Sequence, residues 1–240
     1  MKKILFACAL APLFLTACGD DEDELPKVDP GDVAYTQCPD GKHPHAIDLG
    51  LPSGTKWACC NIGSKTETDY GQHFAWGDPQ IKTRFSWPSY SHYEIIDFAP
   101  HVAYLGEDIQ GSQNDVARNL WQHKWEMPSL DQFTELRSNC RIEWTKRDLG
   151  NGEVVRGILA TGKNGASIFL PAGGYKESAG ADDAMFDYHR EAGAMGYYWL
   201  SNAYPEVNDY AQRVVISSSK RIDFSTYYRC IGHSIRPVRK

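Results

Sequence analysis

The sequence predicts an α+β domain in which strands predominate, preceded by an export signal and a polar tether. Apolar runs rich in β-branched and aromatic residues recur through the second half of the chain and are separated by turn residues. Helical spacing of apolar residues is clear at only two places, both in the first half. Strands and helices do not alternate along the chain, so a parallel βαβ sheet is not expected.

An apolar run opens the chain and ends at a cysteine. Lys2 and Lys3 precede residues 4–15, which are mostly apolar, and the motif "LTAC" leads into Cys18. The run is about half of the roughly 20 residues that span a bilayer, so residues 1–17 are interpreted as a secretory signal peptide rather than a transmembrane helix. Small residues directly before a cysteine resemble the lipobox of bacterial lipoproteins. The resemblance implies lipidation of Cys18 and attachment to the membrane through that lipid only.

Residues 18–44 are predicted to hold the acylated cysteine, an acidic tether and the lead-in to the folded domain. The segment "DDEDE" at 20–24 puts five carboxylates in a row, which cannot pack in a core, and Pro26 and Pro30 keep the following residues extended. An acidic cluster just after an acylated cysteine resembles the export signal of Bacteroidota lipoproteins. It implies a surface-exposed protein, lipid-anchored in the outer membrane; a plain charged spacer is the alternative.

The composition favours one folded domain and excludes one class of partner. The formal net charge is −6 and no basic stripe is visible, so nucleic acid is not an expected partner. Residues 45–240 suffice for one domain with a sizeable core. Aromatic residues make up 12% of the chain and are spread along it, which suits a mostly β domain with large loops.

The first half of the domain is predicted to hold strands, a long loop and two helices. Residues 46–63 indicate strand, turn and strand, with the turn at 52–54, and residues 69–77 indicate an aromatic-rich strand. Residues 78–113 have no sustained period and are interpreted as a long surface loop, of a length that is often functional. A short helix capped by Asn114 is expected over 114–122. Ser129 and Gln132 form a capping box that predicts the start of a second helix.

The second half is predicted to be a meander of antiparallel strands. The segment "VVRGILATGKNGASIFLP" holds two apolar runs around Asn164 and Gly165, and Asn-Gly is a strong hairpin signal because both residues tolerate positive φ. Further strands are expected at 197–201, 211–217 and 221–224. The segment "SIRPV" is predicted to close the chain as a last strand.

Six stretches in order resemble one family: "DLGLPSGTKWACCNIG", "DYGQHFAWGD", "NDVARNLWQHKWEMPS", "TGKNGASIFLPAGG", "GYYWLSN" and "GHSIRPV". Over nearly all of residues 45–239 the chain is similar to the Fibrobacter succinogenes major paralogous domain, known as FISUMP, which is common in exported Bacteroidota proteins. The resemblance implies a fold related to C-type lectins and to the formylglycine-generating enzyme, with paired first and last strands and functional loops on one side. It implies no particular activity. Glu126 stands where the family usually has arginine, and residues 122–124 where it has small glycines, so the turn before Met127 is expected to differ.

Five cysteines follow the tether, namely Cys38, Cys59, Cys60, Cys140 and Cys230. In an oxidising compartment they allow two disulfides and one thiol, and spacing alone does not assign the pairing. No C-x-x-C pair is present, so a zinc site is not indicated. Compared with the family pattern, Cys59 and Cys230 are additions, and their pairing is the expectation. Cys60 with Cys140 would be the second bridge, and Cys38 the remaining thiol.

The first functional hypothesis is a lectin-like module for glycan binding or adhesion. Sugars are held by aromatic faces and by polar groups that bond hydroxyls, and in C-type lectins a calcium ion bridges the two. The loop "SNAYPEVND" offers oxygen ligands for calcium or a sugar, although it also suits an ordinary polar hairpin loop. The aromatic residues of the long loop offer a platform for sugar rings, although they also suit packing of that loop onto the body. The candidate ligand-binding residues are Trp87, Tyr90, Tyr93, Asn202, Glu206, Asn208 and Asp209.

Two other functional classes are weighed against binding. The chain has no G-x-S-x-G, H-E-x-x-H, Walker or dinucleotide motif. An oxidase of the formylglycine-generating kind needs a cysteine pair, and "YYRCIG" holds only Cys230, so an enzyme is not expected. A subunit of a surface fibre is the runner-up, because nothing in the sequence excludes it. A fibre subunit would be favoured by an arginine near the amino terminus at which a protease cleaves, and residues 25–45 contain no arginine. The expected partner is therefore a glycan or a surface protein, with calcium as the only cofactor considered.

Overall fold

The computed structural model describes residues 44–121, 124–178 and 187–240. The signal peptide, Cys18, the acidic tether and Cys38 lie outside the described residues, as do residues 122–123 of the turn before Met127. Among the helices described, none is both long and apolar enough to cross a membrane.

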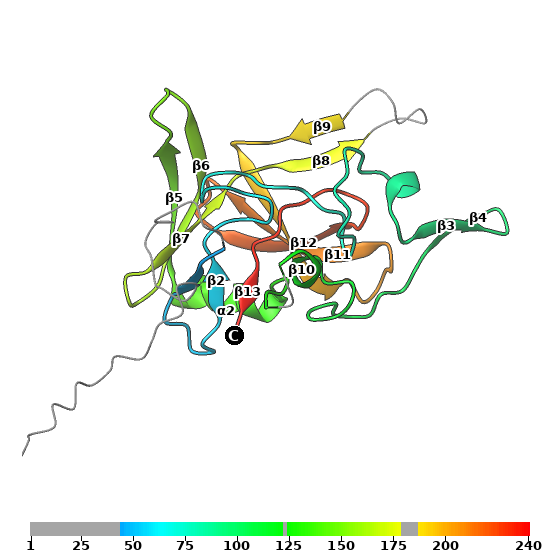
Figure 1. Cartoon of the computed structure of the whole chain (residues 1–240), viewed down its shortest axis with the longest axis horizontal. Coiled ribbons are helices and arrows are strands. Elements are labelled where there is room, and N and C mark those ends of the chain that lie inside the picture. The colour runs from blue at the N-terminus through cyan, green and yellow to red at the C-terminus, as the bar shows by residue number, and fades with distance from the viewer. Residues whose placement is uncertain (1–43, 122–123, 179–186) are drawn as a thin grey trace, which may run out of the picture.

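The described chain is mostly β-strand with two short α-helices, which agrees with the predicted α+β class (Figure 1). The elements form several small antiparallel sheets rather than one large sheet. In chain order they are β1 (Ala46–Asp48), β2 (Lys56–Ala58), the 3-10 helix η2 (Trp87–Ser89), β3 (Tyr93–Ile96), β4 (Ala99–Val102), α1 (Val116–Leu120), α2 (Leu130–Asn139), β5 (Arg141–Asp148), β6 (Val154–Thr161), β7 (Ser167–Pro171), β8 (Tyr175–Ser178), β9 (Asp187–Arg190), β10 (Met195–Ala203), β11 (Tyr210–Ser217), β12 (Ile222–Tyr228) and β13 (Val238–Arg239).

The two ends of the described domain meet in one small sheet. Its order is β1-β2-β13, so the first and last strands both flank β2 (Figure 1). The expectation that these two strands pair with each other is therefore wrong, because each pairs with β2 instead. The fully buried Arg236 reinforces this closure, because its guanidinium donates to the Ala58 carbonyl at 3.0 Å, to Asn61 Oδ1 at 2.8 Å and to the Phe169 carbonyl at 2.7 Å. The prediction of a last strand over "SIRPV" is wrong in its position, because β13 covers Val238 and Arg239 and shares only Val238 with that segment.

The centre of the body is the antiparallel sheet β10-β11-β12 (Figure 1). All three strands were predicted, and each is longer than expected. Two buried indoles link β10 to residues 74–76. Trp199 Nε1 donates to the Phe74 carbonyl and Trp76 Nε1 donates to the Leu200 carbonyl, both at 2.8 Å. The predicted strand at 69–77 is wrong in its extent, because only an isolated bridge between Phe74 and His233 forms there.

The hairpin predicted around Asn164 and Gly165 is present as β6 and β7. A third strand, β5, pairs with β6 along its whole length. Sequence reasoning missed β5 because none of its residues is fully buried, so it carries no apolar run. The hairpins β3-β4 and β8-β9 were missed as well, and β3-β4 projects from the body inside the segment expected to be an irregular loop (Figure 1).

Helix α2 begins as predicted, since Ser129 Oγ accepts from the Gln132 amide and Gln132 Oε1 accepts from the Ser129 amide. Helix α1 is capped by Asp115 and not by Asn114, which corrects the expectation. The Asp115 carboxylate is fully buried and accepts from the amides of Gly111, Arg118 and Met127. It therefore fixes the loops on both sides of α1 as well as the helix start.

The two predicted disulfides are absent, because no disulfide joins any two of Cys59, Cys60, Cys140 and Cys230. Cys59 lies in the main hydrophobic core, where its Sγ accepts from the His45 amide at 3.2 Å, whereas Cys230 lies in a separate cluster with Phe85 and Tyr90. Cys60 and Cys140 pack against the same core but are not bonded to each other. Packing, rather than covalent bridges, therefore holds the described domain together.

Candidate functional site

Five partly exposed aromatic side chains from distant parts of the sequence form a continuous series of ring contacts. The Trp87 ring lies 5.8 Å from that of Tyr93 and 5.9 Å from that of Tyr228. Tyr228 lies 4.5 Å from Tyr210, its cross-strand partner in β11, and Tyr210 lies 6.5 Å from Tyr204. We call Trp87, Tyr93, Tyr204, Tyr210 and Tyr228 the aromatic strip. The strip joins the long loop to the central sheet.

Tyr90 is not part of this surface, which corrects the expectation that it contacts a ligand. Its side chain is 2% exposed and its hydroxyl donates to the Trp76 carbonyl at 2.7 Å. Burial raises the pKa of Tyr90 well above its usual value. The centre of its ring lies 5.9 Å from that of Trp87, so the buried Tyr90 packs against one ring of the strip.

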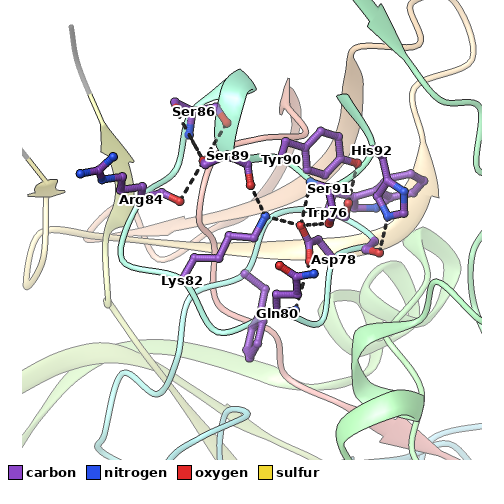
Figure 2. A network of polar contacts seen from close by, with 12 residues as sticks. Trp76, Asp78, Gln80, Lys82, Arg84, Ser86, Ser89, Tyr90, Ser91 and His92 are labelled. Carbon is purple, nitrogen blue, oxygen red and sulfur yellow. Dashed lines mark hydrogen bonds and ion pairs between the residues drawn. The ribbon is translucent and has the colours of Figure 1, made fainter. Parts of the chain in front are cut away.

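A buried carboxylate fixes the segment that carries Trp87 and Tyr93 (Figure 2). Asp78 is fully buried and accepts from the Lys82 ammonium, from the amide and hydroxyl of Ser91, and from the Gln80 amide. Lys82 also donates to the Ser89 carbonyl. Burial alone would raise the pKa of Asp78, but the hydrogen bonds from Lys82 and Ser91 outweigh it and hold the pKa below its usual value. The segment is therefore held by an ionised group at neutral pH.

A cavity of about 270 Å³ lies at the Tyr204 end of the aromatic strip. We call it the Arg229 cavity; its walls are Tyr104, Glu107, Ala203, Tyr204, Pro205, Glu206, Asn208 and Arg229. The Tyr204 hydroxyl donates to Glu206 Oε2 at 2.7 Å, and the Asn208 amide donates to the Val102 carbonyl at 2.6 Å. Asn208 Oδ1 is buried and has no hydrogen-bond partner in the described part of the chain. The wall therefore contains an acceptor that is not satisfied.

Arg229 is the buried cation of this cavity, with a side chain 1% exposed. Its Nε donates to the Tyr210 carbonyl at 3.2 Å and its Nη1 to the Ala103 carbonyl at 3.4 Å. Its Cζ lies 4.3 Å from the centre of the Trp76 ring, a cation–π contact. Burial lowers the pKa of Arg229, and Tyr90 and Asp209 partly offset this.

The structure brings together only part of the polar set predicted at 202–209. Glu206 and Asn208 line the cavity, and the Asp209 carbonyl accepts from the Arg229 amide at 2.9 Å. Asn202 instead caps the start of α2, since its Oδ1 accepts from the Leu130 amide at 2.7 Å. Within residues 44–121, 124–178 and 187–240, no group of three or more His, Cys, Asp and Glu side chains could hold a metal ion. Calcium therefore gains no support from this loop.

A larger hollow, of about 590 Å³, lies between the 68–71 segment and the turn joining β5 to β6. It contains none of the predicted ligand-binding residues. Its carboxylate Asp69 already accepts from the amides of Lys65 and Thr66. The hollow therefore offers less unsatisfied polar chemistry than the Arg229 cavity.

Sequence reasoning missed Tyr204, Tyr210, Tyr228 and Arg229. Strand β12 was expected to end at Phe224, so Tyr228 fell outside it and its cross-strand pairing with Tyr210 was invisible. A signal was nevertheless present, because Arg229 interrupts an otherwise apolar stretch from Tyr227 to Ile231. A charged residue in such a stretch indicates a buried polar role.

Cys230 does not have the environment of a reactive thiol. It is buried next to Arg229, and burial raises its pKa to about 12, whereas nucleophilic cysteines have lowered pKa values. No protein-family model, curated protein or solved structure matches this chain. Its function is therefore inferred from the chemistry of the aromatic strip and the Arg229 cavity.

Proposed function

We propose that this protein is a surface-exposed lipoprotein whose folded domain is a non-catalytic, lectin-like module that binds a glycan along the aromatic strip. The observation that supports this most is the continuous strip of five partly exposed rings that ends at a polar cavity. The C–H faces of sugar rings pack on aromatic side chains, while polar groups fix the orientation of the ligand.

The strip is suited to binding because it is organised in advance. The Asp78 network fixes the segment of Trp87 and Tyr93, and the central sheet fixes Tyr210 and Tyr228. A hydrogen bond with Tyr228 raises the pKa of Tyr210 to about 12, so the Tyr210 phenol is neutral at physiological pH. Rigid aromatic anchors lose little conformational entropy when a ligand binds.

The sequence resemblance to the FISUMP domain supports the same proposal. It implies a C-type-lectin-like fold, in which loops on one side of the domain serve for binding. The position of β1 and β13 on either side of β2 is consistent with the joined ends of such a fold. The strip is built largely from the segment after Gly77 and from the ends of β11 and β12.

The test is binding of the chain without its signal peptide, with Cys18→Ser, to a broad glycan panel in the presence of calcium or of chelator. We expect saturable binding that persists in chelator. Tyr228→Ala should weaken it about tenfold, or about 1.4 kcal/mol, without changing the fold, because that ring is 41% exposed. Leu149→Ala, on an exposed turn away from the strip, is the control. Absence of any glycan binding would refute the proposal.

A second candidate, a subunit of a surface assembly, is favoured by the tip of the β3-β4 hairpin. Ile95, Ile96 and Phe98 are exposed there, and the Phe98 side chain is fully solvent-accessible at 102%. Exposed apolar clusters often mark protein contacts. Sedimentation velocity of the parent and of Ile95→Ser/Phe98→Ser separates the two: association lost only in the variant would support assembly.

The proposed location rests on Cys18 and on the acidic residues that follow it. If lipid on Cys18 is the only membrane attachment, Cys18→Ala should move the protein from the membrane fraction to the soluble fraction. If residues 20–24 direct export, their replacement by alanine should abolish protease accessibility on whole cells. Unchanged fractionation or accessibility would contradict each statement separately.

A further inference from the structure

We infer that the Arg229 cavity binds a carboxylate, and that the ligand on the aromatic strip is an acidic glycan whose charged residue, such as a uronic acid, enters this cavity. The inference rests on the proposed function, since it names the class of glycan that the same surface takes. It is carried by the guanidinium of Arg229, which has no carboxylate within 4.0 Å among the described residues, by its place in the cavity wall and by the continuity of that cavity with the strip.

The two fully buried arginines of the chain differ in how their charges are satisfied. In Arg236 all three guanidinium nitrogens donate, at 2.7 to 3.0 Å, and this side chain is structural. In Arg229 the two donated bonds are longer, at 3.2 and 3.4 Å, and go to neutral carbonyls. Among the described residues no hydrogen bond from Nη2 is present, and no carboxylate lies within 4.0 Å of the guanidinium. Nη2 is not one of the buried polar atoms that lack a partner, so it is open to solvent and can donate to a ligand. An anion that reaches it would form a charge-assisted hydrogen bond.

The chemistry of the wall selects the partner. A guanidinium is a planar fork that matches a carboxylate through two parallel hydrogen bonds. Glu107 and Glu206 also line the cavity, and they disfavour a doubly charged phosphate more than a singly charged carboxylate. Their oxygens, together with those of Asn208, are acceptors for hydroxyl groups. One carboxylate surrounded by hydroxyls is the pattern of a uronic acid.

Size and position agree with a single sugar residue. At about 270 Å³ the cavity is slightly smaller than the range of roughly 300 to 1,000 Å³ that holds drug-sized ligands. Tyr204 belongs both to the strip and to the cavity wall, and the exposed Tyr104 ring also lines that wall. A glycan lying on the strip would therefore bring its last residue to Arg229.

The test compares glucuronate with glucose, in which a hydroxymethyl group stands in place of the carboxylate, by titration of the Cys18→Ser chain that lacks the signal peptide. We expect glucuronate to bind at least about tenfold more tightly, and this preference to shrink as salt is raised. Arg229→Lys keeps a charge but loses the fork, and should abolish the preference. Because that buried substitution could unfold the chain, Glu107→Gln is the second variant. Removal of an exposed like charge, with one acceptor oxygen kept, should strengthen glucuronate binding severalfold more than it changes glucose binding.

The outcomes separate this inference from the proposed function. Equal affinity for glucuronate and glucose, or no binding of glucuronate, would overturn the inference, whereas binding of neutral glycans in the panel would leave the proposed function standing. Binding of glucuronate and of acetate with equal affinity, without any glycan binding, would support a carboxylate site and refute the lectin. A preference for glucuronate that ignores both salt and Glu107→Gln would also overturn the inference.

Discussion

Replacing Asp78 with alanine removes the acceptor that holds the start of the long loop to the body. The carboxylate is fully buried and accepts from Lys82, from Ser91 and from the Gln80 amide. Lys82 would lose its carboxylate partner in a site where its side chain is only 10% exposed. The change therefore leaves a buried ammonium and several donors without their partner.

The expected cost follows from that geometry. Breaking a buried ion pair by removal of one partner costs about 3 to 5 kcal/mol. We expect about 3 kcal/mol, the lower end, because Lys82 retains the Ser89 carbonyl as an acceptor. Asp78→Ala/Lys82→Met should cost less than Asp78→Ala alone, since the second change removes the unpaired charge.

Urea unfolding of the parent, the two single variants and the double variant measures this coupling. Glu94→Gln is the matched control, because Glu94 pairs with His101 on the same loop while both remain largely exposed, and such pairs contribute about 0 to 1 kcal/mol. Glycan affinity should fall with Asp78→Ala, since Trp87 and Tyr93 lose their fixed positions. An unfolding free energy within about 0.5 kcal/mol of the parent, or a double variant less stable than Asp78→Ala, would refute the reasoning.

Three further predictions concern stability and thiol chemistry. Ser129→Ala should cost about 1 kcal/mol in thermal or urea unfolding, and Ser129→Asn much less, because the capping bond to the Gln132 amide is lost only in the first; equal costs would contradict the capping role. Burial, with smaller contributions from His189 and Lys176, lowers the pKa of His73 to about 3, so between about pH 6.5 and 3 only the unfolded chain binds this proton. Stability should thus fall as the pH drops through this window and His73→Gln should flatten the slope; an unchanged slope would count against it. Burial raises the pKa of Cys230 to about 12, so Cys230 should resist iodoacetamide at pH 8 in the native protein and react once the protein is unfolded. A peptide map made without reductant should show no Cys59–Cys230 link. Rapid labelling of the native protein, or such a link, would overturn this prediction.

Local sequence signals predicted the elements whose cause is local. The capping box at Ser129 and the Asn-Gly turn at 164–165 are read directly from neighbouring residues, and both are present. The β3-β4 hairpin gave no such signal, because its turn places Asp97 and Phe98 at positive φ without glycine or asparagine. Its strands are also exposed, so they lack an apolar face to recognise.

The candidate site was predictable only in part, for a related reason. Trp87, Tyr93, Glu206 and Asn208 were identified because their loops stand out in composition. Their convergence depends on long-range contacts, such as the Asn208 amide on the Val102 carbonyl, which no local pattern encodes. The disulfide expectation failed likewise, since the number of cysteines permits bridges but only packing decides which sulfur atoms meet.

The closure of the first sheet by the last residues sets the order in which the chain can fold. Strand β2 is synthesised long before its partner β13, and Arg236 lies 178 residues after Ala58, whose carbonyl it binds. Joining segments so far apart in sequence is slow, because the entropy of closing the loop is lost before the contacts form. A nascent chain must therefore keep the core beneath β2 open until β13 has been synthesised. A chain cut before Arg236 would lack both the β13 pairing and the Arg236 hydrogen bonds, so this sheet could not close.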